Sequence, residues 1–273
     1  MSASSWIDLS DAVINAIFIT VRTGSSRLPG KALLELDGKP TIRQVIDRAK
    51  RSKIADVIVL CTTELPEDEA LCVIAKDAGI AWSRGSENDK LERWLGAVRE
   101  FGVDFFVTAD GDDLFCEPEL IDLAFEQHGR GGADFIEGTN IPVGAFTYGI
   151  SASALQQVCD MKATNDTEMM WVYFKDTGMF AVEELTGVDD VFRRPEIRMT
   201  LDYPEDFEFF SRIVEDLGRI KPGFDLRDVI QYLDEHPGVI EINRHMTAAW
   251  AQNQRDKTSL QLKSGFAKEA SSD

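Results

Sequence analysis

Apolar runs and amphipathic segments alternate along the first half of the chain. Four short apolar runs indicate β-strands, at residues 13–21, 55–61, 79–82 and 103–109. Between and after these runs, apolar residues recur at helical spacing in four segments, at residues 42–49, 66–78, 91–98 and 118–128. Strands that alternate with helices in this way are typical of βαβ units on a parallel sheet. The pattern therefore predicts an α/β fold.

The pattern changes between residues 130 and 187. Shorter strands are predicted near Phe135 and at 145–150, with helices at 153–161 and 167–176. A returning strand at 198–201 and helices starting at Pro204 and after Asp225 follow. We expect one domain over residues 1–245, with a small inserted lobe of strands and helices at about 140–186. Residues 246–273 are polar and lack clear periodicity, which predicts an extended arm on a partner or a partly disordered tail.

A loop with glycines, serines and three cations follows the first apolar run. Residues 22–31 read Arg-Thr-Gly-Ser-Ser-Arg-Leu-Pro-Gly-Lys. Glycines permit close backbone approach, and serines add hydroxyl donors to exposed backbone N–H groups. Charge-assisted hydrogen bonds to phosphate are worth roughly 1.5 to 3 kcal/mol each. We therefore predict a phosphate-binding loop whose contacts come from Arg22, Gly24, Ser25, Ser26, Arg27 and Lys31.

The spacing of this loop differs from that of a Walker A loop. Five residues separate Gly24 from Gly30 where the Walker A motif has four, and Ala32 stands where that motif needs Ser or Thr. The remaining alternative is a plain connection from strand to helix that carries surface basic residues.

The charge balance limits the class of ligand. The chain carries 29 basic and 48 acidic residues, a formal net charge of -19, so nucleic acid and anionic membranes are not expected partners. Its local basic cluster is expected to serve a small anion. The four cysteines are scattered, without metal-ligand spacing, which fits a reducing cytoplasm. Neither a signal peptide nor a membrane span is expected.

Acidic residues follow two of the predicted strands. Asp110, Asp112 and Asp113 follow the fourth apolar run, and Asp202 follows the returning strand. Because ligands bind at the carboxyl edge of parallel sheets, these acids and the basic loop should face one another. Mg²⁺ binds one or two carboxylates together with phosphate oxygens. The arrangement suits a triphosphate and magnesium in nucleotidyl transfer, although Asp112 could be a turn residue and Asp202 a helix N-cap.

Three motifs resemble those of a known family. The loop at 22–31, with Gly38-Lys-Pro40, resembles the nucleotide-binding signature of the cytidylyltransferases that activate sugar acids. Residues 110–121 are similar to the Gly-Asp segment that leads into a Pro-Glu-Leu-Ile helix in that family, and 200–206 look like its Asp-x-Pro-Glu-Asp motif. The resemblance is closest to the spore-coat-polysaccharide branch, related to acylneuraminate and 3-deoxy-manno-octulosonate cytidylyltransferases.

The resemblance implies a three-layer, Rossmann-like nucleotidyltransferase fold with a mainly parallel central sheet. It also implies a cytidylyltransferase activity. CTP would react with a hydroxyl of a 2-keto sugar acid to give a CMP-sugar acid and pyrophosphate, for surface glycan biosynthesis. Arg22, Arg27 and Lys31 would be catalytic, and Asp112 and Asp202 would hold Mg²⁺, with Mn²⁺ as a substitute. Transfer to a sugar phosphate, phospho-alcohol or phosphonate stays open, as does a non-catalytic nucleotide-binding subunit.

Contacts to the base or ribose are a further implication of the resemblance. They would come from Thr62, Arg84, Gly85, Ser86 and Asp89. A loop that only caps the next helix explains residues 84–89 nearly as well.

The insertion carries an unusual number of large apolar residues. They are Phe146, Met169, Met170, Trp171, Phe174, Met179 and Phe180. Met and aromatic residues are enriched at interfaces, so we expect a homodimer through this lobe; packing against the main domain is the alternative.

Residues 140–180 correspond to the region where members of the family bind the sugar, but they resemble it poorly. The identity of the acceptor therefore stays open. A carboxylated acceptor would need a cation from the second half of the chain. We expect Arg193, Arg194 or Arg198 to pair with its acid group, because they immediately precede the strand that delivers Asp202.

Overall fold

The computed structural model describes residues 13–266. Its centre is a seven-stranded sheet with the strand order β5-β4-β1-β6-β8-β7-β9. The bounds of the strands are β1 Asn15–Thr20, β4 Val57–Thr63, β5 Ala81–Gly85, β6 Phe105–Asp110, β7 Phe135–Glu137, β8 Tyr148–Ser151 and β9 Val182–Glu184. A short hairpin of β2 (Glu35–Leu36) and β3 (Lys39–Pro40) stands apart from it.

The four strands predicted in the first half of the chain lie next to one another in the sheet and are parallel. β1 pairs in parallel with both β4 and β6, and β4 pairs in parallel with β5. β8 then runs antiparallel to β6 and to β7. The carboxyl ends of β1 and β6, at Thr20 and Asp110, lie opposite each other in the register. The loops that follow these two strands therefore leave the sheet side by side.

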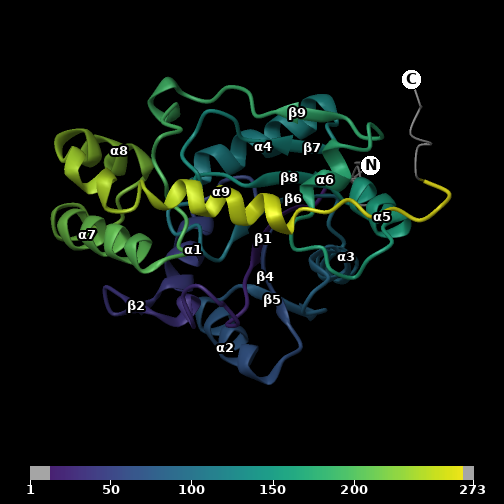
Figure 1. Cartoon of the computed structure of the whole chain (residues 1–273), viewed down its shortest axis with the longest axis horizontal. Helices are drawn as coiled ribbons and strands as arrows, with labels where there is room; N and C mark the ends of the chain where they lie inside the picture. The colour runs from purple at the N-terminus through teal and green to yellow at the C-terminus, as the bar shows by residue number, and fades with distance from the viewer. Residues whose placement is uncertain (1–12, 267–273) are drawn as a thin grey trace, which may run out of the picture.

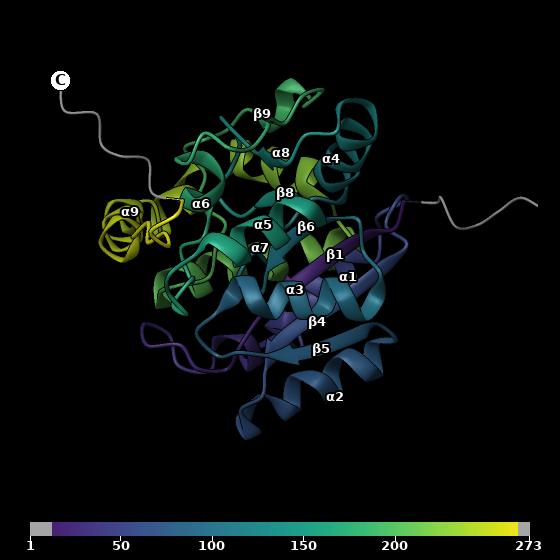
Figure 2. The same ribbon diagram turned by 90° about the vertical axis from the view of Figure 1, so that its right-hand side faces the viewer.

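Helices cover both faces of the sheet. Their bounds are α1 Thr41–Ala49, α2 Glu69–Ala78, α3 Lys90–Phe101, α4 Pro118–Gly131, α5 Ala152–Met161, α6 Trp171–Lys175, α7 Pro204–Ile220, α8 Leu226–Glu235 and α9 Met246–Lys257. Buried residues of α1, α2, α4, α7 and α8 form one core cluster, and those of α3, α5 and α6 form a second. Figure 2 shows α3 and α5 on one side of the strands. The structure thus confirms the three-layer α/β fold.

Alternation along the strands explains the two core layers. In β1, Ile17 and Ile19 pack into the first cluster, whereas Ala16 and Phe18 pack into the second. Successive side chains of a strand point to opposite faces, so a strand covered on both sides is apolar throughout. This is why the first apolar run could be recognised as a central strand.

The segment at 198–201 differs from the prediction, because it forms no strand of the main sheet. It makes a single parallel bridge, between Val143 and Arg198. The backbone N–H of Met199 donates to Val143 O, and that of Leu201 donates to Asp112 O. Its hydrogen-bond partners are loop residues rather than a strand of the sheet, so the run does not join the sheet. It nevertheless brings Asp202 beside the loop after β6.

The segment at 140–186 extends the main sheet through β8 and β9. Most of its large apolar residues pack within the chain: Met170 and Phe174 are buried, and Phe146 is nearly so. Met179 is exposed. The apolar crowding that favoured a homodimer is thus largely satisfied inside one chain, and the dimer stays a prediction.

The polar tail also differs from the prediction. Residues 246–257 form α9, which runs across the face of the molecule from near α8 towards α6 (Figure 1). No residue of α9 is buried, which explains the lack of apolar periodicity in its sequence. The segment is therefore helical and lies on its own chain over residues 246–257. The final residues of the predicted tail, 267–273, lie outside the described part.

No helix within residues 13–266 has both the length and the apolar character needed to cross a bilayer.

Candidate active site

The loop after β1 and the acids after β6 enclose one cavity. The cavity has a volume of about 410 Å³. All six predicted phosphate-loop residues and both predicted metal ligands line it: Arg22, Gly24, Ser25, Ser26, Arg27, Lys31, Asp112 and Asp202. Asp110 and Asp113 line it as well. The structure therefore brings together at one sheet edge the two groups that the sequence placed after different strands.

The backbone turns sharply just before Lys31. Gly30 has a φ of 66°, in the left-handed region that favours glycine. The carbonyl of Gly30 accepts from the N–H of Leu33, and the carbonyl of Lys31 accepts from the hydroxyl of Thr41. The turn is thus tied to the first residue of α1, and this fixes the position of Lys31.

Lys31 bridges the two predicted metal ligands. Its Nζ lies 2.6 Å from Asp112 Oδ2 and 2.9 Å from Asp202 Oδ1. Arg27 Nη2 also donates to Asp202 Oδ1, at 2.5 Å. Four charged groups from three distant parts of the sequence therefore meet within hydrogen-bond distance.

Burial and the two carboxylates act in opposite directions on Lys31. Burial alone would lower the pKa of Lys31, but the charges of Asp112 and Asp202 outweigh it and raise the pKa. For Asp202, burial alone would raise the pKa; the charges of Lys31 and Arg27 outweigh it and lower the pKa to about 2. Lys31 and Asp202 are therefore charged at neutral pH.

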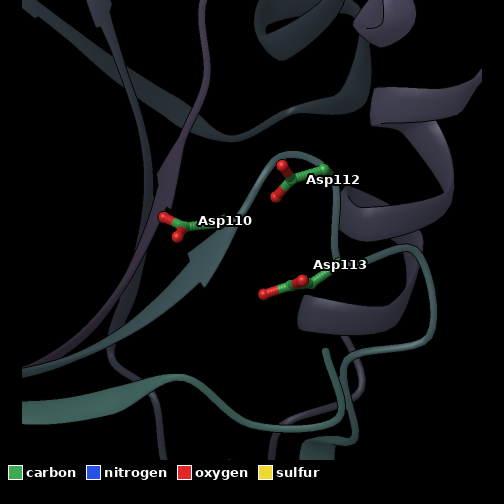
Figure 3. Close-up of side chains that lie close together, drawn as sticks. All are labelled: Asp110, Asp112 and Asp113. Carbon is green, nitrogen blue, oxygen red and sulfur yellow. The ribbon is translucent and has the colours of Figure 1, made fainter. Parts of the chain in front are cut away.

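Asp110, at the end of β6, and Asp112 and Asp113, on the loop that follows, form an acidic cluster (Figure 3). One carboxylate oxygen of each lies within 4.8 Å of the others. Burial and the charges of Asp202 and Asp110 raise the pKa of Asp112, although Lys31 opposes this; burial and the charges of Asp112 and Asp110 raise the pKa of Asp113. Lys31 therefore does not offset the combined effect of burial and of the neighbouring carboxylates on Asp112.

Gly111 lets this loop pass close to the phosphate loop. A Cβ at position 111 would lie 2.6 Å from Val21 Cβ, so any other residue would force the two loops apart. The Gly-Asp pair in the sequence thus has a steric reason, because Gly111 makes room for the approach that places Asp112 near Lys31.

The N-cap alternative for Asp202 is wrong. At the start of α7 it is Asp206 whose carboxylate accepts from the backbone N–H groups of Asp202 and Tyr203. Asp206 also pairs with Arg198, from Nε at 2.8 Å and from Nη2 at 2.9 Å. The side chain of Asp202 is therefore free to face the cations of the cavity.

Replacing Asp206 by alanine is expected to lower the free energy of unfolding by about 3 to 5 kcal/mol. The change leaves the buried guanidinium of Arg198 without its bidentate partner and two backbone N–H groups without an acceptor. Urea unfolding measures the loss. Glu126→Ala is the control, because its pair with Arg130 is exposed and should change stability little. Equal effects of the two substitutions would contradict the structural role of Asp206.

Residues that were predicted to contact the base or ribose are instead buried or bound to other residues of the chain. Thr62 is fully buried, Arg84 donates to the carbonyls of Thr63 and Leu65, and Asp89 pairs with Lys162 at 2.5 Å. Of the predicted set of Thr62, Arg84, Gly85, Ser86 and Asp89, none lines the cavity within the described chain. Their neighbours Glu87 and Asn88 do line it.

The arginines predicted to bind an acceptor acid are also engaged elsewhere. Arg193 donates to Thr139 O, Arg194 pairs with Glu196 and Asp234, and Arg198 pairs with Asp206. None of the three is among the described residues that line the cavity.

Sequence reasoning missed several residues of the cavity. Lys90, at the start of α3, lies 3.0 Å from Asp110. Glu168, Trp250, Gln254 and Lys257 also line the cavity. Lys90 could have been found as the first residue of a helix that follows a sheet-edge loop. The residues of α9 gave no such signal.

This combination of cations, small residues and clustered carboxylates could hold both a triphosphate-sized anion and a divalent cation. Such a site on a mainly parallel sheet is of the nucleotidyltransferase type. The sequence comparison narrows the class. The pattern of the family described as "Cytidylyltransferase" matches residues 16–221, and the chain belongs to that family.

Individual relatives and a solved structure agree with this family. The chain is 26% identical to the spore coat polysaccharide biosynthesis protein SpsF of Bacillus subtilis over 225 residues, which cover 80% of this chain and 93% of that protein. It is 36% identical over 110 residues to a 3-deoxy-manno-octulosonate cytidylyltransferase of Anaeromyxobacter, covering 39% and 44% of the two chains. A cytidylyltransferase structure from Leptospira borgpetersenii shares the fold, with a TM-score of 0.76, 24% identity, and coverage of 84% and 97%.

Proposed function

We propose that the protein transfers CMP from CTP to a hydroxyl of a 2-keto sugar acid and releases pyrophosphate. The observation that carries the proposal is the position of Lys31, which joins Asp112 and Asp202 at the end of a glycine- and serine-containing loop. Membership of the cytidylyltransferase family supports CTP as the donor. The partial match to 3-deoxy-manno-octulosonate cytidylyltransferase supports a sugar acid as the acceptor. The match to a spore coat polysaccharide biosynthesis protein supports surface glycan biosynthesis as the setting.

The donor set fits a divalent metal ion. Asp112 and Asp202 share the Lys31 ammonium group, and Asp110 and Asp113 add two further carboxylates nearby. Mg²⁺ prefers such oxygen ligands together with phosphate oxygens and water, and Mn²⁺ would substitute for it. When bound, the metal ion would neutralise phosphate charge and lower the pKa of the acceptor hydroxyl. We propose Asp112 and Asp202 as its protein ligands.

The residues of this chain would act mainly by positioning and charge. Arg22, Arg27 and Lys31, with the backbone and hydroxyls of Gly24 to Ser26, would hold the triphosphate. The acceptor oxygen would attack the α-phosphorus while its hydroxyl proton passes to solvent water, the bond from the α-phosphorus to the bridging oxygen would break, and pyrophosphate would leave. Cations already fixed in place stabilise the charge that develops on the leaving group without reorganising during the reaction.

A second candidate acceptor is a phospho-alcohol or phosphonate that carries an ammonium group. Glu137, Asp166 and Glu168 line the cavity, and their carboxylates oppose an acidic acceptor, although Lys175 pairs with Glu137 and Lys257 with Glu168. Trp171 and Trp250 also line it, and aromatic faces bind ammonium groups. This set favours a cationic acceptor, which the experiment below separates from a sugar acid.

These functions are tested by measuring the release of pyrophosphate from CTP in the presence of Mg²⁺ and of each of four acceptor pools. The pools are 2-keto sugar acids, sugar 1-phosphates, amino-bearing phosphonates and amino-bearing phospho-alcohols. Turnover of a sugar acid alone is the expected result. Turnover of an amino-bearing acceptor alone would replace the sugar-acid proposal with the second candidate. No turnover with any pool would favour a non-catalytic nucleotide-binding subunit.

We also propose a cytoplasmic location and a homodimer. The location rests on the reduced, scattered cysteines, all four of which are buried and free.

The dimer rests on the apolar residues that stay exposed in the segment at 140–186, such as Met179. A monomeric mass in sedimentation at micromolar concentration would contradict the dimer.

A further inference from the structure

Helix α9 crosses the cavity without being part of the hydrophobic core. Trp250, Gln254 and Lys257 on it line the cavity, yet none of its residues is buried. It also lies beyond residues 16–221, which match the family. Polar contacts rather than apolar packing must therefore hold it in place.

These contacts fix α9 at both ends. Near its start, the guanidinium of Arg198 lies 5.4 Å from the ring centre of Trp250. At its end, Lys257 Nζ lies 3.7 Å from Glu168. Beyond the helix, Ala163 N donates to Gln261 O and Lys263 N donates to Met161 O. The helix thus runs from the contact with Arg198 to the contact with Glu168, and Figure 1 shows α9 passing from near α8 towards α6.

The middle of α9 contacts the phosphate loop directly. Asn253 Oδ1 accepts a hydrogen bond from Arg27 Nη1 at 2.5 Å. Nη2 of the same guanidinium donates to Asp202 Oδ1 at 2.5 Å, and the ring centre of Tyr203 lies 5.4 Å from its Cζ. The direction of the Arg27 guanidinium is therefore set by a carboxylate on one nitrogen and an amide on the other.

An amide and a carboxylate affect a cation differently. Asp202 fixes Arg27 and also cancels its charge, whereas the amide of Asn253 fixes Arg27 and leaves the charge available. A divalent cation on Asp202 would compete with Arg27 for the same carboxylate oxygen. The contact with Asn253 would remain, because a neutral amide oxygen is a poorer ligand for the cation than the carboxylates around it.

We propose that Asn253 is a positioning residue that holds Arg27 towards the triphosphate without neutralising it, an inference that rests on the proposed function. The chemical requirement is a neutral hydrogen-bond acceptor at this place on α9. The residue acts through Arg27, and the ligand concerned is the metal-bound triphosphate of the nucleotide.

A purely structural role for Asn253 predicts the opposite effect of one substitution. Asn253→Asp keeps an acceptor oxygen and adds a charge, so the contact with Arg27 would become an ion pair and α9 would be held at least as firmly. The same ion pair would cancel the charge of Arg27. If Asn253 only docks the helix, Asn253→Asp is benign and Asn253→Ala is harmful; if it positions a usable cation, Asn253→Asp is the more harmful for nucleotide binding.

Calorimetric titration of the full chain with CTP and Mg²⁺, together with thermal unfolding, separates these roles. We expect Asn253→Asp to weaken binding by about tenfold or more, the value of one charge-assisted hydrogen bond, and Asn253→Ala by less. Thermal stability should follow the reverse order, with Asn253→Asp the more stable. Gln252→Glu adds the same charge to the exposed face of α9, where Gln252 hydrogen-bonds with Asp256 and Arg255, and should bind like the wild type.

Each other outcome decides against a stated part of the account. If Asn253→Asp binds CTP as tightly as Asn253→Ala or more tightly, Asn253 only docks α9 and the inference is overturned. A loss in Gln252→Glu equal to that in Asn253→Asp would also overturn it, because general charge would then explain the effect. If the wild type itself fails to bind CTP with Mg²⁺, the proposed function falls and this inference falls with it.

Discussion

Asparagine in place of Asp202 is expected to lower the rate of nucleotidyl transfer by roughly 100-fold or more, the usual scale for loss of a preorganised electrostatic group. Asp202 is buried and contacts both Lys31 and Arg27. The amide keeps the shape but removes the charge that a metal ligand needs. The start of α7 should stay intact, since Asp206 and not Asp202 accepts from its first N–H groups.

The loss should appear in kcat rather than in CTP binding. Without the charge of Asp202, one carboxylate fewer competes with phosphate for Lys31 and Arg27. Binding of CTP in the absence of Mg²⁺ should therefore be unchanged or tighter. Asp112→Asn should behave alike, because Asp112 shares Lys31 with Asp202. Asp216→Asn on the exposed part of α7 is the control and should be fully active. Full activity of Asp202→Asn at saturating Mg²⁺ would remove Asp202 from the metal site.

Alanine in place of Lys31 is expected to lower kcat/KM by roughly 100-fold or more, because it removes a fixed cation from the developing phosphate charge. An exposed lysine could be replaced with little loss of stability. The structure shows instead a largely buried ammonium group between two carboxylates, with 15% of the side chain exposed. Its removal leaves those carboxylates unopposed and should cost roughly 1 to 3 kcal/mol of stability without metal.

Mg²⁺ gives this prediction a second readout. A divalent cation would neutralise the unopposed Asp112 and Asp202, so thermal unfolding of Lys31→Ala should gain more stability from Mg²⁺ than that of the wild type. Lys221→Ala, which removes an exposed partner of Asp228, is the matched control and should change neither activity nor the response to Mg²⁺. Near-wild-type turnover of Lys31→Ala would exclude the loop from catalysis.

The parts of the site that could be predicted from the sequence depend on local pattern. The phosphate loop and the acids at 110–113 follow apolar strands directly, and parallel strands deliver such loops to one edge. Asp202 was also predicted there, although its segment pairs with loops rather than with the sheet. Its position depends on contacts of Met199 and Leu201 that no local pattern reveals.

The parts that could not be predicted depend on partners that are distant in the sequence. Asp89 was expected at the nucleotide, but its carboxylate pairs with Lys162, 73 residues away. Arg198 was expected at the acceptor, but Asp206 holds it inside the fold. Helix α9 gave no apolar period because it buries nothing, so a polar sequence that looked like a free tail contains residues of the cavity wall.

The most direct test of the central claim follows the α-phosphate of CTP. CTP labelled in that phosphate is incubated with Mg²⁺ and with 3-deoxy-manno-octulosonate as the acceptor. The label should move into a CMP-sugar acid, and one pyrophosphate should be released for each product formed. The account predicts that the transfer needs the divalent ion and is lost in both Lys31→Ala and Asp202→Asn. Transfer that persists in these two variants, or that proceeds equally with a chelator present, would contradict the account.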